Sequence, residues 1–263
     1  MKKAALKELI IFVCLTFLLM YGTHALIALL INTNQFVFDD APIQLLSVLG
    51  GGAPAFSALF IIFRYYDQSQ QKRFWASVYR LRVYFLWWLF IFLAPWSVLF
   101  LTNLFYSQSL GFIDLSMSDI IGFPLLFLGM IIAGGAEELG WRGIMQKKME
   151  THVNLVYIGL IIGVLWGVWH LPLFLIDSFA HYDYNFFIYL LSTVLFSLLI
   201  SGLVFKTGSV GLAILFHAAI NAFSNLGFGI PMILNFVIIL SLTILILISI
   251  LWLIYLQKDP QEA

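Results

Sequence analysis

Charged residues are scarce in this 263-residue chain, at 10% of the sequence, against roughly 25% in an ordinary soluble domain. The 13 basic and 13 acidic residues cancel, so no basic surface for a nucleic acid is expected. Cysteine is nearly absent, because the single Cys14 can form neither a disulfide framework nor a thiolate metal cluster. What the chain has instead is apolar: 62% of its residues are hydrophobic and its mean hydropathy is +1.02, more than a soluble fold of this size can bury.

The apolar residues form runs long enough to cross a bilayer as helices, each of which needs about 20 residues. None of them alternates with the period of two that a membrane β-strand shows, and the first is too long for a cleaved signal peptide. The sequence therefore predicts an all-α, polytopic membrane protein, with about eight transmembrane helices in a single integral membrane domain over 1–263. The predicted spans are 8–32, 43–63, 84–104, 119–140, 154–176, 186–205, 210–229 and 231–256.

The basic residues are sorted between the two sides that these spans define. If both termini are cytoplasmic, every Lys and Arg lies at or toward the cytoplasmic side, as the positive-inside rule requires, and the opposite loops carry Asp but no Lys or Arg. We therefore expect a multi-pass protein of the cell membrane with both termini in the cytoplasm. The basic residues are Lys2, Lys3, Lys7, Arg64, Lys72, Arg73, Arg80, Arg82, Arg142, Lys147, Lys148, Lys206 and Lys258.

Three charged residues lie at the inner half of the fourth span, where each is costly in lipid. Glu138 and Arg142 are four residues apart and can pair along one helix face. Glu137 lies about 100° further around the helix, so Arg142 cannot easily neutralise both carboxylates. A helix end at the lipid headgroups would explain the cluster without any chemistry, but the pair Lys147-Lys148 marks that interface better. Glu137 is therefore a candidate general base.

The fifth span carries Gly159, Gly163 and Gly167 at four-residue spacing, a face that allows close helix packing. His170 projects from the same face, and Pro172 should disturb the helix beside it. In an antiparallel hairpin of the fourth and fifth spans, Glu137 and His170 are nearly equidistant from the turn. The two side chains are therefore expected at equal depth, facing each other, although a hydrogen-bonded packing role for His170 is the plain alternative.

The seventh span places two polar residues on one face, His217 and Asn221, four residues apart in an apolar stretch. Hydrogen bonding between helices would account for both of them. The remaining histidines, His24, His152 and His181, lie in the first span and in loops, and we expect them to be non-catalytic.

Together these residues form three motifs in a fixed order on separate helices. They read Glu137-Glu138-Leu139-Gly140-Trp141-Arg142, Trp166-Gly167-Val168-Trp169-His170 and His217-Ala218-Ala219-Ile220-Asn221. This constellation resembles the CPBP family of CAAX-protease and bacteriocin-processing membrane proteins, also called Abi or type II CAAX prenyl endopeptidase-like. The resemblance covers about 119–225. The second motif usually begins with Phe, and Trp166 departs from that pattern.

The resemblance implies a glutamate-dependent intramembrane endopeptidase. Glu137 would activate a water that His170 helps to hold, while His217 and Asn221 would stabilise the tetrahedral oxyanion. Glu138 and Arg142 would brace the site. The implied substrate is a peptide bond in a membrane-associated peptide or a lipidated protein, and no cofactor is required.

Three alternatives stay open at this point. Two His and a Glu could form a catalytic zinc site, as in a metalloendopeptidase, although no His-Glu-x-x-His is present. The chain could instead be a non-proteolytic immunity or scaffolding protein that keeps the protease fold and acts through a membrane partner protein. A small proton-relaying transporter is a third possibility, which no inverted repeat supports.

Overall fold

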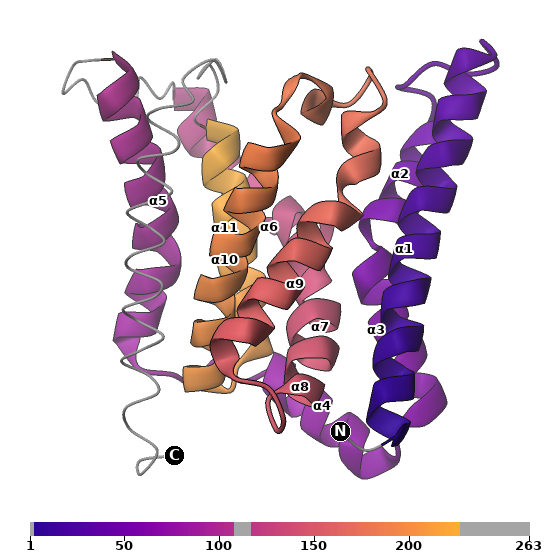
Figure 1. Ribbon diagram of the computed structural model, residues 1–263. Helices are drawn as coiled ribbons and strands as arrows, with labels where there is room; N and C mark the ends of the chain where they lie inside the picture. Colours follow the sequence, from indigo (N-terminus) through magenta and orange to yellow (C-terminus); the bar gives the residue numbers. More distant parts are fainter. Residues whose placement is uncertain (1–2, 108–116, 227–263) are drawn as a thin grey trace.

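The structure, a computed structural model, describes residues 3–107 and 117–226, without the side chains of 97–107 and 226. All of its regular elements in these ranges are helical (Figure 1), so the predicted all-α membrane fold is confirmed. The longer helices are α1 Lys3–Asn32, α2 Ala41–Gly51, α3 Ala53–Tyr65, α4 Gln68–Val78, α5 Phe85–Ser107, α6 Met117–Ala133, α9 Leu155–Trp169, α10 Phe186–Thr207 and α11 Val210–Leu226. The short ones are η1 Gly135–Glu137, α7 Glu138–Gly140, η2 Trp141–Gln146, α8 Lys147–Met149, η3 Leu171–Phe174 and η4 Ala180–Asp183.

Three helical stretches in the described ranges are long and apolar enough to cross a membrane: α1, α10 and the run Met117–Met149. The pair α2 and α3 makes a fourth if it is one span, and three shorter apolar helices lie in α5, α9 and α11. The number of eight spans and the side of the two termini stay predictions. The predicted eighth span, 231–256, lies outside the described residues.

The second predicted span is not one continuous helix. α2 and α3 meet at an angle of 59° around Gly52, and Pro54 stands in the first turn of α3. Proline has no backbone N–H to give to the preceding turn, which is why the helix breaks here. A Cβ on Gly50 would lie 2.5 Å from the His24 ring, so the end of α2 packs directly on α1.

An amphipathic helix that the hydropathy runs do not reveal, α4, lies at the end of the bundle where α1 begins (Figure 1). It starts with a capping box, in which Asp67 and Gln70 satisfy each other's backbone N–H groups. Phe74 is its one buried residue, and it fills the space that Gly143 leaves open. α4 therefore closes this end of the bundle beneath η2.

Charged residues join the helices at this same end. Lys148 of α8 pairs with Glu8 of α1, and its ammonium lies 4.8 Å from the ring centre of Tyr66, just after α3. The Lys7 ammonium lies 6.0 Å from the ring centre of Tyr65. Lys7 and Lys148, which come from distant parts of the sequence, thus lie at the same end of the bundle.

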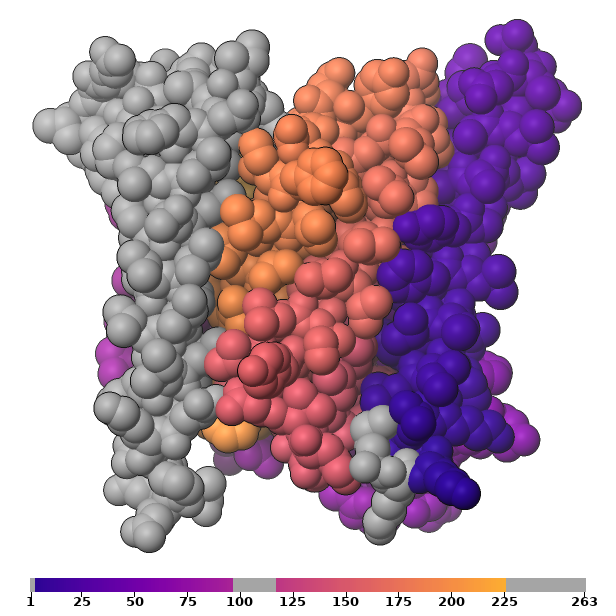
Figure 2. Space-filling view, viewed as in Figure 1, coloured from indigo at the N-terminus to yellow at the C-terminus, as the bar shows by residue number. Residues whose placement is uncertain are grey.

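The predicted glycine face of α9 packs on α10, which lies beside it (Figure 1). A Cβ on Gly159 would lie 2.7 Å from Leu198, and one on Gly163 would lie 2.5 Å from the backbone of Val194. The two helices therefore approach as closely as their backbones allow. Figure 2 shows one face of the molecule, on which α1, α9 and α10 lie side by side.

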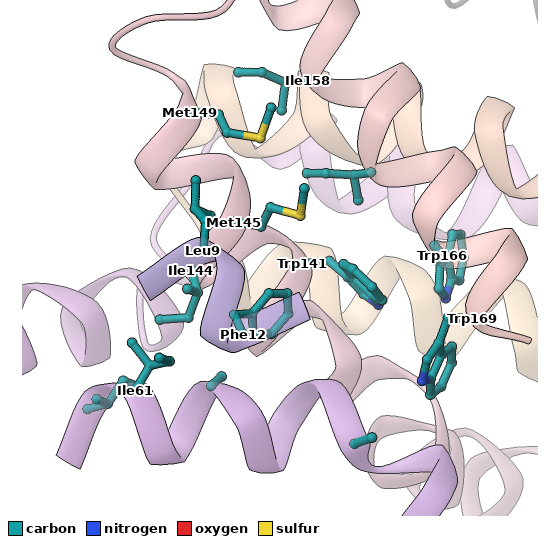
Figure 3. Packing of buried hydrophobic residues seen from close by; sticks show 14 of the residues in the cluster. Leu9, Phe12, Ile61, Trp141, Ile144, Met145, Met149, Ile158, Trp166 and Trp169 are labelled. Carbon is teal, nitrogen blue, oxygen red and sulfur yellow. The ribbon is translucent and has the colours of Figure 1, made fainter. Parts of the chain in front are cut away.

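One hydrophobic cluster of the described residues gathers large aromatic side chains between α1, η2 and α9 (Figure 3). Trp141 is fully buried and makes edge-to-face contacts with Phe12, at 5.5 Å between ring centres, and with Trp169, at 6.3 Å. Trp166 belongs to the same cluster. This aromatic wall stands beside the residues that the sequence motifs single out.

Candidate active site

Glu137 is presented by an irregular turn and not by a continuous helix. The predicted helix over 119–140 ends at Ala133, and Gly134 adopts φ −145° and ψ −51° before a single 3-10 turn. The Glu137 N–H donates to the Gly134 carbonyl at 2.9 Å. The chain then continues through one turn of α-helix into a π-helix over η2. Such breaks aim side chains in directions that a straight helix cannot.

The two glycines before this turn are places of close approach to α11. A Cβ on Gly134 would lie 2.2 Å from Asn221 Nδ2 and 3.3 Å from His217 Nε2. A Cβ on Gly135 would lie 2.6 Å from the backbone oxygen of Ile214. Side chains at these positions would push the polar face of α11 away, so the glycines allow Asn221 and His217 to reach the turn that carries Glu137.

Glu138 and Arg142 form the predicted ion pair, and both side chains are fully buried. Arg142 Nη1 lies 3.1 Å from Glu138 Oε2. The other end of the guanidinium donates to the carbonyl and hydroxyl of Ser197 in α10, at 3.2 Å and 3.0 Å. The second carboxylate oxygen, Oε1, accepts from His217 Nδ1 at 2.9 Å. This pair therefore ties the Glu137 turn to α10 and to α11.

The Glu137 carboxylate is held by a residue that sequence reasoning did not select for a role. Trp166 Nε1 donates to Glu137 Oε2 at 2.7 Å, and the Glu137 residue is only 6% exposed. The sequence predicts that Glu137 faces His170. In the structure its carboxylate is instead hydrogen-bonded to Trp166, one helical turn before His170. The signal in the sequence was the Trp at a position where the family usually has Phe, because only the indole brings an N–H donor.

His170 caps the C-terminal end of α9, which stops at Trp169, and Pro172 follows in the first turn of η3. The predicted span to 176 is therefore shorter as a helix, as the proline leads one to expect. His170 Nδ1 lies 2.8 Å from the Trp166 carbonyl oxygen. A carbonyl can only accept, so Nδ1 carries the proton and the neutral ring offers Nε2 as an acceptor.

The four predicted catalytic residues come from three elements, and three of them meet around one indole. The Trp166 ring centre lies 5.8 Å from that of His170 and 5.1 Å from that of His217, and its nitrogen binds Glu137. The Asn221 side chain lies beside Gly134, just before the turn that carries Glu137. The structure thus brings Glu137, His170 and His217 together and places Asn221 at their edge.

His181 is closer to the site than its place in an outer loop suggests. Its ring lies 6.3 Å from that of His170 and nearly parallel to it, and it also packs on Phe174 and Tyr189. Burial lowers the pKa of His181 to about 4, so its ring stays uncharged at neutral pH. The contact between His170 and His181 has no signature in the sequence, because it forms only when the chain folds back through η3 and η4.

Comparison with known proteins agrees with the motifs. The family model described as type II CAAX prenyl endopeptidase Rce1-like matches residues 119–223, and the predicted resemblance to the CAAX-protease family is confirmed. The chain is 32% identical over 108 residues to CAAX prenyl protease 2 of Methanococcus maripaludis, which is 37% of this chain and 38% of that protein. It is 26% identical over 129 residues to lysostaphin resistance protein A of Staphylococcus haemolyticus, which is 47% of this chain and 34% of that protein. The matches thus span little more than a third of either relative.

Proposed function

We propose that this chain, whose residues 119–223 match the model of the Rce1-like type II CAAX prenyl endopeptidases, is an intramembrane endopeptidase that uses a glutamate-activated water. The observation that carries the proposal is the convergence of Glu137, His170 and His217 on Trp166, within the apolar part of the bundle. The proposed substrate is a peptide bond in a membrane-associated peptide or a lipidated protein. We expect the chain to act as a multi-pass protein of the cell membrane.

Glu137 is the proposed general base. Its side chain is nearly buried, and Trp166 Nε1 donates to Oε2, so we assign the uptake of a proton from water to Oε1. The water then attacks the carbonyl carbon, and the same carboxyl group returns the proton to the leaving amine as the C–N bond breaks. His170 supports this step, because its Nε2 can accept the second hydrogen of that water.

His217 and Asn221 are the proposed donors to the tetrahedral oxyanion. Glu138 engages Nδ1 of His217, which leaves Nε2 on the side of Gly134 and Asn221. For Nε2 to donate, the ring must carry protons on both nitrogens, a form that the adjacent Glu138 carboxylate can pair with. The Asn221 amide donates in any state. Glu138 and Arg142 brace this arrangement.

A pair of glycine substitutions separates the role of Asn221 from simple packing. In Gly134→Ala the new Cβ meets the mobile end of the Asn221 side chain, so we expect hydrolysis to fall by about 10²-fold, the loss seen when one oxyanion donor is displaced, with little loss of stability. In Gly135→Ala the Cβ meets the Ile214 backbone, and the free energy of unfolding should fall by about 1–3 kcal/mol. Peptide hydrolysis and thermal melting measure the two effects, and equal losses in both variants would contradict the assignment of Asn221.

The direct test compares membrane peptides from cells that make the protein with those from cells that make its Glu137→Gln variant. Cleavage products are expected only with the unchanged protein. A farnesylated peptide with a CAAX tail and the same peptide without the lipid serve as defined probes for the purified protein. Hydrolysis of the first alone would assign a prenylated substrate, and hydrolysis of both would assign a peptide substrate without a lipid requirement.

Zinc chemistry predicts a different response to a chelator. In the described part of the chain, no three His, Cys, Asp or Glu side chains are grouped closely enough to hold a metal ion. We expect no cofactor requirement, and therefore hydrolysis by the purified protein at an unchanged rate after dialysis against EDTA. Loss of activity that added Zn²⁺ restores, with Mg²⁺ as the control ion, would replace the glutamate mechanism by a metal-bound water.

A second function, non-proteolytic immunity or scaffolding through a membrane partner protein, is favoured by the likeness to a relative named for lysostaphin resistance. This function needs the fold but not the base. It therefore predicts that the Glu137→Gln variant keeps the full biological activity of the protein, whereas proteolysis predicts that the variant loses it.

A further inference from the structure

Trp166 makes two polar contacts at once, and each of them holds a different proposed catalytic residue. Its indole N–H donates to Glu137 Oε2 at 2.7 Å, and its backbone carbonyl accepts from His170 Nδ1 at 2.8 Å. We infer that Trp166 is a positioning residue that orients both the base and the water-holding histidine. The inference rests on the proposed function, because that function gives Glu137 and His170 their roles. The two contacts themselves are observed in the structure.

The indole hydrogen bond fixes which carboxylate oxygen is free to act. A carboxylate has two equivalent oxygens and a soft terminal torsion, so an unrestrained Glu137 would present either of them. The bond to Oε2 removes that choice and leaves Oε1 as the oxygen that Trp166 does not bind. Because the site is buried, the same bond also replaces one of the hydrogen bonds that the carboxylate would have had in water.

The backbone contact fixes the tautomer of His170. Since the Trp166 carbonyl accepts a hydrogen bond from the protonated Nδ1, the lone pair of the neutral ring lies on Nε2, the nitrogen on the far side of the ring. The two polar ends of Trp166 therefore leave one free acceptor on Glu137 and one on His170. In the proposed mechanism, one hydrogen of the water is bound by Glu137 Oε1, which removes it, and the other is bound by His170 Nε2, which orients the water.

Close packing on both sides keeps the Trp166 ring from moving. Its faces and edges meet the rings of His170 and His217 at interplanar angles of 62° and 73°. The next residue, Gly167, lies so near α10 that a Cβ would be 2.5 Å from Leu190. Thr193 of α10 also donates to the Gly163 carbonyl at 3.2 Å. α9 is thus locked in register against α10, and the indole nitrogen is locked with it.

A phenylalanine at this position would keep the ring contacts but not the hydrogen bond, because its ring has no donor. The hold on Glu137 therefore depends on the indole of this chain, which stands where the family pattern has Phe, whereas the backbone contact with His170 would be kept by either residue. A second buried indole, Trp169, provides a matched control in the same helix. Its nitrogen donates to the Thr16 carbonyl at 3.3 Å and does not bind a carboxylate.

The experiment follows the Glu137 carboxyl group directly and needs no substrate. Infrared spectra of the purified full-length protein in lipid nanodiscs are recorded against pH, and the Glu137 band is isolated by subtracting the spectrum of the Glu137→Gln protein. In Trp166→Phe the midpoint of this titration should move to higher pH by about one unit, the size expected for one lost hydrogen bond to a charged group. In Trp169→Phe the midpoint should stay in place.

A second variant removes the N–H without changing the shape of the ring system. Incorporation of 3-benzothienylalanine at position 166 puts sulfur in place of the indole nitrogen, and it keeps the test valid if Trp166→Phe does not fold. The same upward shift is expected. An unchanged midpoint in both Trp166 variants, or an equal shift in Trp169→Phe, would overturn the inference.

Hydrolysis of the farnesylated probe peptide adds the catalytic readout. In Trp166→Phe we expect kcat to fall by at least tenfold at little change in KM, and the acidic limb of the pH profile to move with the infrared midpoint. If the infrared midpoint moves while neither the probe nor any membrane peptide is cut by the unchanged protein, the proposed function fails and the indole contact stands. If cleavage occurs and the midpoint does not move, the inference about Trp166 fails and the proposed function stands.

Discussion

The Glu137→Gln protein is expected to fold normally and to lose peptide hydrolysis by about 10²–10⁴-fold, the contribution typical of a general base. Glutamine has the shape of glutamate, and its amide oxygen can still accept the hydrogen bond from Trp166 Nε1. Little stability should therefore be lost. What is lost is the oxygen that can take a proton from water.

Hydrolysis of the probe peptides by purified protein, together with thermal melting, measures this result. Glu8→Gln is the matched control, because Glu8 pairs with Lys148 at the charged end of the bundle and takes no part in the site. His170→Ala and His217→Ala should also abolish cleavage. If Glu137→Gln cleaves as fast as the unchanged protein, Glu137 is not the base, and full biological activity of this variant would favour the scaffolding function.

Much of the architecture follows from composition and spacing alone. Long apolar runs need helices in lipid, because every backbone polar group must be satisfied within its own segment, and the structure is helical throughout the described ranges. Spacing of four residues was enough to predict that Glu138 pairs with Arg142. It was also enough to place the glycine face of α9 against another helix. Such contacts can be predicted because they depend on residues three or four apart on one helix, whose spacing the sequence gives directly.

The helix breaks were harder to predict, because hydropathy does not report backbone geometry. The runs 43–63 and 119–140 were each predicted as one span through Gly52 and Gly134, yet the helices stop there. The stop at Gly134 is shaped by Asn221 and His217 of α11, far along the chain. A glycine that makes room for a distant helix looks, in the sequence, like any other small residue.

The site could be predicted residue by residue but not contact by contact. The motifs gave Glu137, His170, His217 and Asn221, and the structure supplied the indole that joins the first three. Trp166 was not predicted as a site residue, because an aromatic residue in an apolar helix ordinarily packs in the hydrophobic core and its N–H donor gives no sign of a partner. The π-helix over η2 is a further feature without a sequence signature, and it sets Arg142 toward Ser197 of α10.

Removing the charge of Arg142 should be the most destabilising single change in the site. In Arg142→Met the apolar stem remains, but Glu138 stays fully buried without its cation. Breaking a buried pair in this way costs about 3–5 kcal/mol, because the remaining carboxylate has been taken out of water and keeps only its contact with His217. Lys147→Met is the control in the neighbouring helix. It breaks a more exposed pair with Glu150, for which at most about 1 kcal/mol is expected.

The double variant Glu138→Gln, Arg142→Met distinguishes a buried ion pair from two independent packing residues. Once both charges are gone, no buried charge is left unpaired, so the double variant should lose less stability than the sum of the two single variants. Activity should not recover with stability, because glutamine lacks the negative charge that Glu138 places beside His217 Nδ1. Chemical unfolding in detergent micelles gives the stabilities, and peptide hydrolysis gives the activities. Additive losses would mean that Arg142 acts through its contacts with Ser197 and not as the partner of Glu138.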